Sequence, residues 1–220
     1  MPVLNEAAAI QDRLAALAPL RDDGAEVLVV DGGSTDHTCG LAARNADLII
    51  HSPRGRGLQM NAGAAAARGA VLLFLHADTR LPETALADIR CALADTRRSW
   101  GRFDVAMEGR HPLLPVVAFM TNVRSRLTGI ATGDQAIFIR RATFEAVGGF
   151  RPLALMEDIA LSSALRRLSA PACLETRVTT SGRRWDERGF WRTVLLMWSL
   201  RAAFALGVPP RILARLYGYG

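Results

Sequence analysis

The stretch Val71-Leu-Leu-Phe-Leu75-His76-Ala77-Asp78-Thr79 decides the fold class of this chain. Five consecutive apolar residues, introduced by Gly69 and followed by polar ones, are typical of a buried strand. An imidazole and a carboxylate follow directly at its carboxyl end. In an open parallel sheet, ligands bind at the carboxyl ends of the strands. The stretch therefore predicts an α/β domain that carries His76 and Asp78 in a binding site.

Strand and helix patterns alternate on both sides of that stretch. The other predicted strands cover residues 26–30, 48–50, 102–108, 136–139 and 174–178. The predicted helices cover residues 7–20, 36–45, 58–68, 83–96, 113–126, 143–147, 158–168 and 189–206. This alternation predicts a mostly parallel sheet with helices on both faces.

The composition is that of a globular protein with a strongly basic balance. The chain has 220 residues, of which half are apolar, and its length predicts one domain over residues 1–220. All 27 basic residues are arginine and the net charge is +6. Such a charge favours anionic partners, namely phosphates, nucleotides or an acidic membrane surface. A preference for arginine along the whole chain also fits GC-rich codon usage.

Three widely spaced cysteines favour a reducing compartment, and no signal peptide is recognisable, so we expect a cytoplasmic protein. No uninterrupted apolar run reaches the ~18 residues of a membrane span. The run 194–206 is broken by Arg201, yet the C-terminal helix could lie in a membrane interface as a peripheral contact.

Acidic side chains adjoin several predicted element ends. Glu6 precedes the first helix, Asp31 ends the strand 26–30, and Glu157-Asp158 stands before the helix 158–168. If the fold brings Glu157-Asp158 close to His76 and Asp78, one pair could hold a metal while the other acts as a base. The alternative is structural, because carboxylates at Asp31 or at Glu157-Asp158 would also stabilise the start of a helix.

Two common nucleotide motifs are absent. Gly55-Arg-Gly57 lacks the third glycine of the dinucleotide fingerprint, and a chain without lysine has no P-loop. A dehydrogenase and a P-loop enzyme are therefore excluded.

Five segments in chain order resemble the inverting nucleotide-sugar glycosyltransferases of family 2, which have the GT-A fold. They are Pro2-Val-Leu-Asn-Glu6, Val29-Val-Asp-Gly-Gly-Ser-Thr-Asp36, Gly55-Arg-Gly57 with Asn61-Ala-Gly63, Leu75-His-Ala-Asp-Thr79 and Met156-Glu-Asp158. Three further segments are similar to the radical-SAM/selenodomain-associated subgroup of transferases. These are Trp100-Gly-Arg-Phe-Asp104, Thr128-Gly-Ile-Ala-Thr-Gly-Asp-Gln135 and Thr180-Ser-Gly-Arg-Arg-Trp185.

The resemblance implies a site for a nucleotide-sugar donor. Asp31 would accept a hydrogen bond from the nucleotide base, and Glu6 and Arg56 would line the same pocket. Asp78 matches the last Asp of the family's D-x-D motif and would hold Mg or Mn against the sugar diphosphate. His76 replaces the first Asp of that motif, which makes it a candidate second metal ligand.

The resemblance also assigns the catalytic pair. Asp158 would deprotonate the acceptor hydroxyl, and Glu157 would position it or the acceptor. Contacts to the acceptor or to the diphosphate are expected from Asp134, Gln135, Arg184 and Trp185. The last two could instead form a cation–π pair at the surface.

We therefore expect a metal-dependent glycosyltransferase that moves a sugar, with inversion, from a uridine diphosphate sugar to an unidentified acceptor. A first strand truncated at Met1 and a C-terminal helical segment over 189–220 complete the expected domain. The alternatives are a nucleotidyltransferase of related topology, a degenerate transferase kept as an interaction partner, and a basic nucleic-acid-binding module. Dispersed arginines and carboxylates at strand ends favour the enzyme and predict no nucleic-acid partner.

Overall fold

A computed structural model describes residues 1–218, except for the side chains of Arg184 and Arg188. The amino-terminal part holds a small parallel sheet, sheet A, in the order β1 (Pro2–Val3), β2 (Leu28–Asp31) and β3 (Leu48–His51). The connections hold α1 (Ile10–Ala15), α2 (Ala18–Asp22) and α3 (Thr38–Ala42), and α4 (Arg56–Ala66) follows β3. The single helix predicted over 7–20 is thus interrupted before Ala18-Pro19, because proline donates no backbone hydrogen bond.

Sheet B is larger and mixed. Its order is β4 (Val71–Phe74), β7 (Ile137–Arg140), β6 (Trp100–Glu108), β8 (Ala172–Ser181) and β5 (Thr79–Arg80). Only β6 and β8 pair in parallel, while the other three pairings are antiparallel. The α/β class is confirmed, but the mostly parallel pairing expected from the alternation holds only for sheet A and for β6 with β8.

The direction of β7 is set by a turn. A 3-10 turn, η1 (Gly133–Gln135), precedes β7, and Ala136 between them has a left-handed backbone with φ 47°. The chain enters β7 from this turn and runs against both β4 and β6. Periodicity predicts that residues 136–139 are extended, whereas the turn decides their direction.

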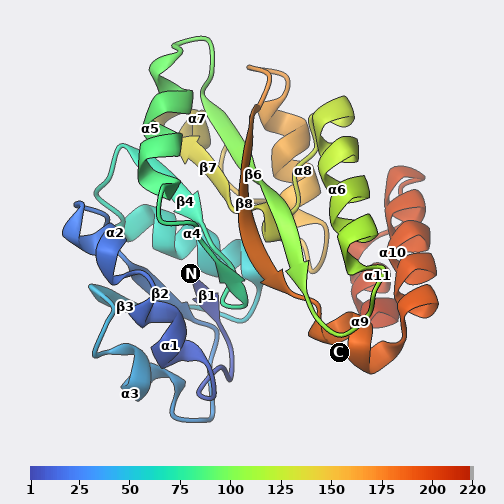
Figure 1. Cartoon of the computed structure of the whole chain (residues 1–220), viewed down its shortest axis with the longest axis horizontal. Helices are drawn as coiled ribbons and strands as arrows, with labels where there is room; N and C mark the ends of the chain where they lie inside the picture. The colour runs from blue at the N-terminus through green and yellow to red at the C-terminus, as the bar shows by residue number, and fades with distance from the viewer. Residues whose placement is uncertain (219–220) are drawn as a thin grey trace.

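Helices cover the central strands from two sides, as Figure 1 shows for α5 (Ala85–Ala94) on one side and α6 (Leu114–Thr128) and α8 (Glu157–Leu165) on the other. The first six residues of β6 are buried, although the alternation in 102–108 predicts one exposed face. Arg102 is therefore fully buried in the strand, paired with Asp104. Its Nη2 also donates to the carbonyl of Asn122 at 3.3 Å.

The carboxyl-terminal third adds α7 (Arg141–Ala146), α9 (Arg183–Arg188), α10 (Phe190–Ala205) and α11 (Pro210–Tyr217). In Figure 1, α10 and α11 form the outermost layer beyond α6. Buried residues of this layer, Leu200 and Leu213, belong to one apolar cluster with Leu155 and Met156. Among the residues that the structure describes, no helix combines the length and hydropathy needed to cross a bilayer.

Candidate active site

Asp31 ends β2 as a buried, hydrogen-bonded carboxylate that is only 2% exposed. It accepts backbone N–H groups from Gly33 at 3.0 Å and Ser34 at 3.1 Å, and the Ser34 hydroxyl as well. Burial raises the pKa of Asp31, but these hydrogen bonds outweigh it and hold the pKa below its usual value. Asp31 is thus an ionised acceptor at a strand end.

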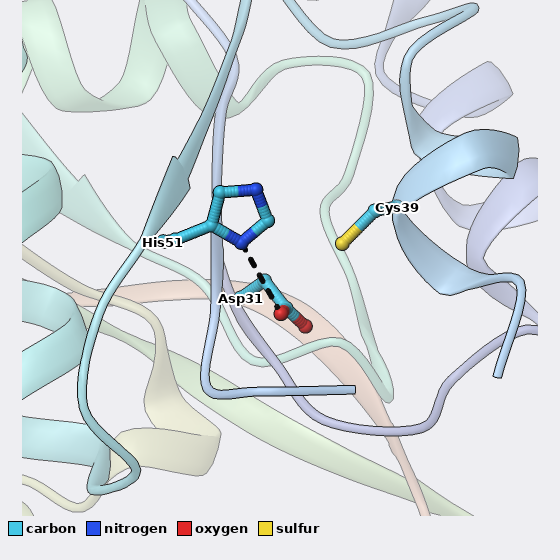
Figure 2. Close-up of side chains that lie close together, drawn as sticks. All are labelled: Asp31, Cys39 and His51. Atoms are coloured by element: carbon cyan, nitrogen blue, oxygen red, sulfur yellow. Dashed lines mark ion pairs between the residues drawn. The ribbon is translucent and has the colours of Figure 1, made fainter. Parts of the chain in front are cut away.

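Two side chains that sequence reasoning did not assign lie beside Asp31. Figure 2 shows the imidazole of His51, from the end of β3, and the thiol of Cys39, from α3, on either side of the carboxylate. His51 Nδ1 is 3.5 Å from Asp31 Oδ2. The sequence assigned no role to His51, whose side chain is 75% exposed, so this contact was not predicted. Parallel pairing of β2 with β3 aligns the two strand ends and brings the groups together.

Asp31, Cys39 and His51 could hold a metal ion, because their ligand atoms all lie within 4.8 Å of one another. This triad differs from the predicted ligands Asp78 and His76. Its nitrogen and sulfur donors suit softer ions such as zinc better than Mg or Mn. Burial raises the pKa of the Cys39 thiol, which keeps it protonated and opposes ligation.

Gln59 holds the end of β2 in place. This side chain of α4 is 4% exposed, and its Nε2 donates to the carbonyls of Val3 at 2.9 Å and Val30 at 2.8 Å. A Cβ at Gly32 would lie 3.0 Å from the Gln59 amide. Gln59 therefore joins β1 to β2 and supports the turn that presents Asp31. A single amide in an Ala-rich helix carried no sequence signal for this role.

The second cluster surrounds the acidic pair at the start of α8. Glu157 is 4% exposed, and Asp158 Oδ2 accepts the backbone N–H of Gly133 at 2.8 Å. Burial, and then the charge of Asp158, raises the pKa of Glu157, while Arg56 and His76 partly offset this effect. The structure thus brings four predicted site residues together, and it places Arg56 beside Glu157.

His76 is in close contact with the loop that binds Asp158. A Cβ at Gly133 would come within 2.2 Å of His76 Cε1, so any larger residue at this position would displace the imidazole. His76 Nδ1 lies 3.7 Å from Asp134 Oδ1. His76 and Asp134, which the sequence assigned to separate roles, therefore lie close to each other and to the loop that binds Asp158.

Glu6 and Asp78 belong to a third part of the site, where their charges act on each other. Burial, and then the charge of Asp78, raises the pKa of Glu6, whereas Arg183 and Arg13 lower it. Asp78 is exposed and lines a cleft of about 570 Å³ whose other walls include Arg13, Arg110 and Arg183. Asp78 therefore shares a polar cleft with several arginines, and Glu6 lies near enough to feel its charge.

The remaining predicted contacts are placed differently. Gln135 is fully buried, and its amide is held near the carbonyl of Phe103 and the side chain of Asn122, both at 3.5 Å. Gln135 supports the Gly133-Asp134 loop from the protein interior. A direct contact between Gln135 and an acceptor does not fit this buried position. Trp185 is half-buried with its ring 5.7 Å from that of Phe190. The side chain of Arg184 lies outside the described residues.

Three non-glycine residues with positive φ adjoin these clusters. They are Asn5 (φ 53°) before Glu6, Ala136 after Gln135, and Met156 (φ 68°) before Glu157. Such conformations cost on the order of 1–3 kcal/mol and persist only where the surroundings enforce them. Their positions favour a site whose geometry is maintained at some expense of stability.

The buried Glu157 predicts a stability difference that depends on pH. Its pKa is higher in the folded than in the unfolded chain, so the folded state loses stability as the pH rises from the unfolded pKa towards the folded one. In metal-free protein, Glu157→Gln should therefore increase the free energy of unfolding at pH 8 and not at pH 4. Urea denaturation at both pH values measures this, and an equal effect at both would contradict it.

Comparison with known proteins gives a family match and curated relatives. The model of Glycosyl transferase family 2 matches residues 1–145. A PGL/p-HBAD biosynthesis glycosyltransferase from Mycobacterium tuberculosis is 33% identical over 170 residues, which cover 68% of this chain and 61% of the relative. A protein of the same name from Mycobacterium bovis matches equally. The chain thus spans about three fifths of the length of these relatives.

Solved structures share the fold at lower identity. TarS 1–349 of S. aureus in complex with UDP-GlcNAc has a TM-score of 0.66 and 18% identity, over 83% of this chain and 57% of that one. Glucosyl-3-phosphoglycerate synthase of Mycobacterium tuberculosis with Mn2+ and UDP-Glc has a TM-score of 0.63 and 22% identity, over 89% of this chain and 76% of that one. Mannosyltransferase PcManGT of Pyrobaculum calidifontis with GDP-Man and Mn2+ has a TM-score of 0.67 and 21% identity, over 99% of this chain and 67% of that one.

Proposed function

Because this chain belongs to glycosyl transferase family 2, we propose that it transfers a sugar from a uridine diphosphate sugar to an acceptor hydroxyl, with inversion at the anomeric carbon. The observation that carries the proposal is the convergence of His76, Asp134, Glu157 and Asp158 at one loop, Gly133-Asp134. These groups come from segments far apart in the chain.

The donor base is proposed to bind at Asp31. Its carboxylate is ionised and buried, so it can accept the imide N–H of a uracil ring in a charge-assisted hydrogen bond. Glu6 and Arg56 are proposed to complete the donor side. TarS with UDP-GlcNAc and glucosyl-3-phosphoglycerate synthase with UDP-Glc support a uridine nucleotide, while the complex of PcManGT with GDP-Man makes guanosine the alternative to test.

A divalent metal, Mg or Mn, is proposed to be held by Asp78, with His76 as a second ligand. The residues fit a hard cation, because Asp78 is exposed to the cleft and its negative charge raises the pKa of Glu6. A cation there would relieve this repulsion. When bound, the metal would offset the charge that grows on the leaving nucleoside diphosphate.

Asp158 is proposed as the base and Glu157 as its positioning partner. The acceptor oxygen attacks the anomeric carbon, the bond from that carbon to the diphosphate oxygen breaks with its electron pair, and Asp158 takes the hydroxyl proton. The N–H of Gly133 fixes one Asp158 oxygen during this step. Asp134, Trp185 and Arg184 are proposed to contact the acceptor or the diphosphate, and Gln135 to act through the loop that it supports.

Three broader proposals accompany this mechanism. The likeness of Trp100–Asp104, Thr128–Gln135 and Thr180–Trp185 supports membership of the radical-SAM/selenodomain-associated subgroup. Residues 1–220 would act as one glycosyltransferase domain with 189–220 as its C-terminal helical segment. The enzyme would work in the cytoplasm, with α10 as a peripheral membrane contact.

Nucleotide binding tests the donor site. Isothermal titration with uridine, guanosine and thymidine diphosphates, each with and without Mn2+, should show tightest binding of the uridine nucleotide with Mn2+. Asp78→Ala should weaken that binding about 10- to 100-fold, because a carboxylate that holds the metal is lost. Glu83→Ala is the matched control, because Glu83 is an exposed carboxylate outside the candidate site. No nucleotide binding under any metal condition would contradict the proposal.

A further inference from the structure

The outer face of α10 is an exposed apolar stripe. Trp191, Leu195 and Trp198 are each 66–68% exposed, and their spacing of four and three residues places them on one side of the helix. Leu206, at 86% exposed, follows the end of α10. On α11, the exposed apolar residues are Ile212 and Leu216.

The neighbouring helix α6 carries a second stripe. Its exposed apolar residues, also at helical spacing, are Val116, Phe119, Met120 and Leu127. At the start of the two helices, the ring of His111 stacks on that of Phe190 with centroids 4.3 Å apart. Further along, the charges of Arg124 and Arg201 act on each other. The helices therefore lie side by side, as Figure 1 also shows.

The charged side chains that α6, α10 and α11 themselves carry have one sign. The sequence contains no acidic residue over 109–133 or over 188–220. Exposed cations accompany the apolar residues, namely Arg192 on α10 and Arg211 and Arg215 on α11. Exposed tryptophan and leucine beside arginine, with no carboxylate, is typical of helices that lie in the interface of an anionic bilayer.

The inner side of the same unit touches the candidate catalytic segment. Leu200 of α10 and Leu213 of α11 are buried in one cluster with Leu155 and Met156. Met156 directly precedes the acidic pair at the start of α8. A surface bound by the outer face would thus be fixed in position relative to Asp158.

We propose that α6, α10 and α11 form a docking surface for an anionic lipid bilayer, and that the acceptor hydroxyl belongs to a lipid of that bilayer. The acceptor assignment rests on the proposed function, whereas the docking does not. A second copy of this chain fits less well, because an isologous contact would set the cationic stripes of two copies against each other.

Vesicle flotation tests the docking surface. The chain should float with vesicles of phosphatidylglycerol and phosphatidylcholine, and markedly less with phosphatidylcholine alone. The triple variant Trp191→Gln/Leu195→Gln/Trp198→Gln should bind the anionic vesicles about tenfold more weakly or worse, because three interfacial anchors are lost. Leu168→Gln, at a 59% exposed leucine outside these helices, should bind like the parent chain.

A charge variant and two further readouts complete the test. Arg211→Gln/Arg215→Gln should weaken binding to anionic vesicles only. The proposal is overturned if the parent chain fails to float, if the triple variant floats equally well, or if size exclusion shows a parent dimer that the triple variant converts to monomer. Nucleotide binding with Mn2+, measured on the same samples, separates failure of docking from failure of the proposed function.

Discussion

Asp158→Asn should lower turnover about 10³-fold while nucleotide binding persists, because the amide cannot accept the proton of the attacking hydroxyl. Asparagine retains an oxygen that can accept the N–H of Gly133, so the loop geometry should survive. Release of uridine diphosphate from the donor, with water as the acceptor, measures turnover without knowledge of the natural acceptor. Circular dichroism checks that the fold is unchanged.

Glu145→Gln is the matched control for this variant. Glu145 is an exposed carboxylate on α7, and its loss should leave turnover unchanged. If the turnover of Asp158→Asn stays within a few-fold of that of the parent enzyme, Asp158 is not the base. Loss of nucleotide binding in the same variant would instead indicate that Asp158 helps to bind the donor.

Arg102→Ala should lower the free energy of unfolding by about 3 kcal/mol, because it removes a buried cation from its partner. Arg102 is fully buried in β6, where its guanidinium pairs with Asp104. Asp104 also pairs with Arg126 at 2.7 Å, so it retains one cation in the variant. The loss combines a cavity in the sheet with a weakened ion network, and urea denaturation at neutral pH measures it.

Arg97→Ala provides the comparison at the surface. Arg97 pairs with Asp95 at 3.0 Å, but its side chain is 88% exposed. Removing this exposed pair should leave the free energy of unfolding nearly unchanged, because water and salt screen the two charges. If both variants lose the same free energy of unfolding, burial does not determine how much the pair of Arg102 and Asp104 contributes to stability.

Much of the candidate site could be predicted from local sequence. An apolar run followed by His76 and Asp78, and an acidic pair at the start of a helix, are patterns that neighbouring residues determine. The contact between His76 and Asp134 agrees with placing both in the site, although their roles stay proposals. Gln135 was expected to contact the acceptor or the diphosphate and is buried, because a residue in a turn can face inward as well as outward.

Other parts depend on contacts distant in sequence. The positions of Cys39 and His51 beside Asp31 follow from how α3 and β3 pack against β2. The role of Gln59 requires two carbonyls from different strands. No local pattern encodes such meetings, so sequence reasoning had no signal for them.

The sequence by itself determined the α/β class, the order of most elements and the positions of the carboxylates at element ends. These follow from side-chain periodicity, which acts within a few residues. The tertiary structure alone decided that sheet B is mixed, that Arg56 lies beside Glu157, and that α10 and α11 pack on Leu155 and Met156. Strand direction and side-chain partners depend on which segments, distant in sequence, bury their apolar surfaces against each other. These contacts form only when the whole chain packs.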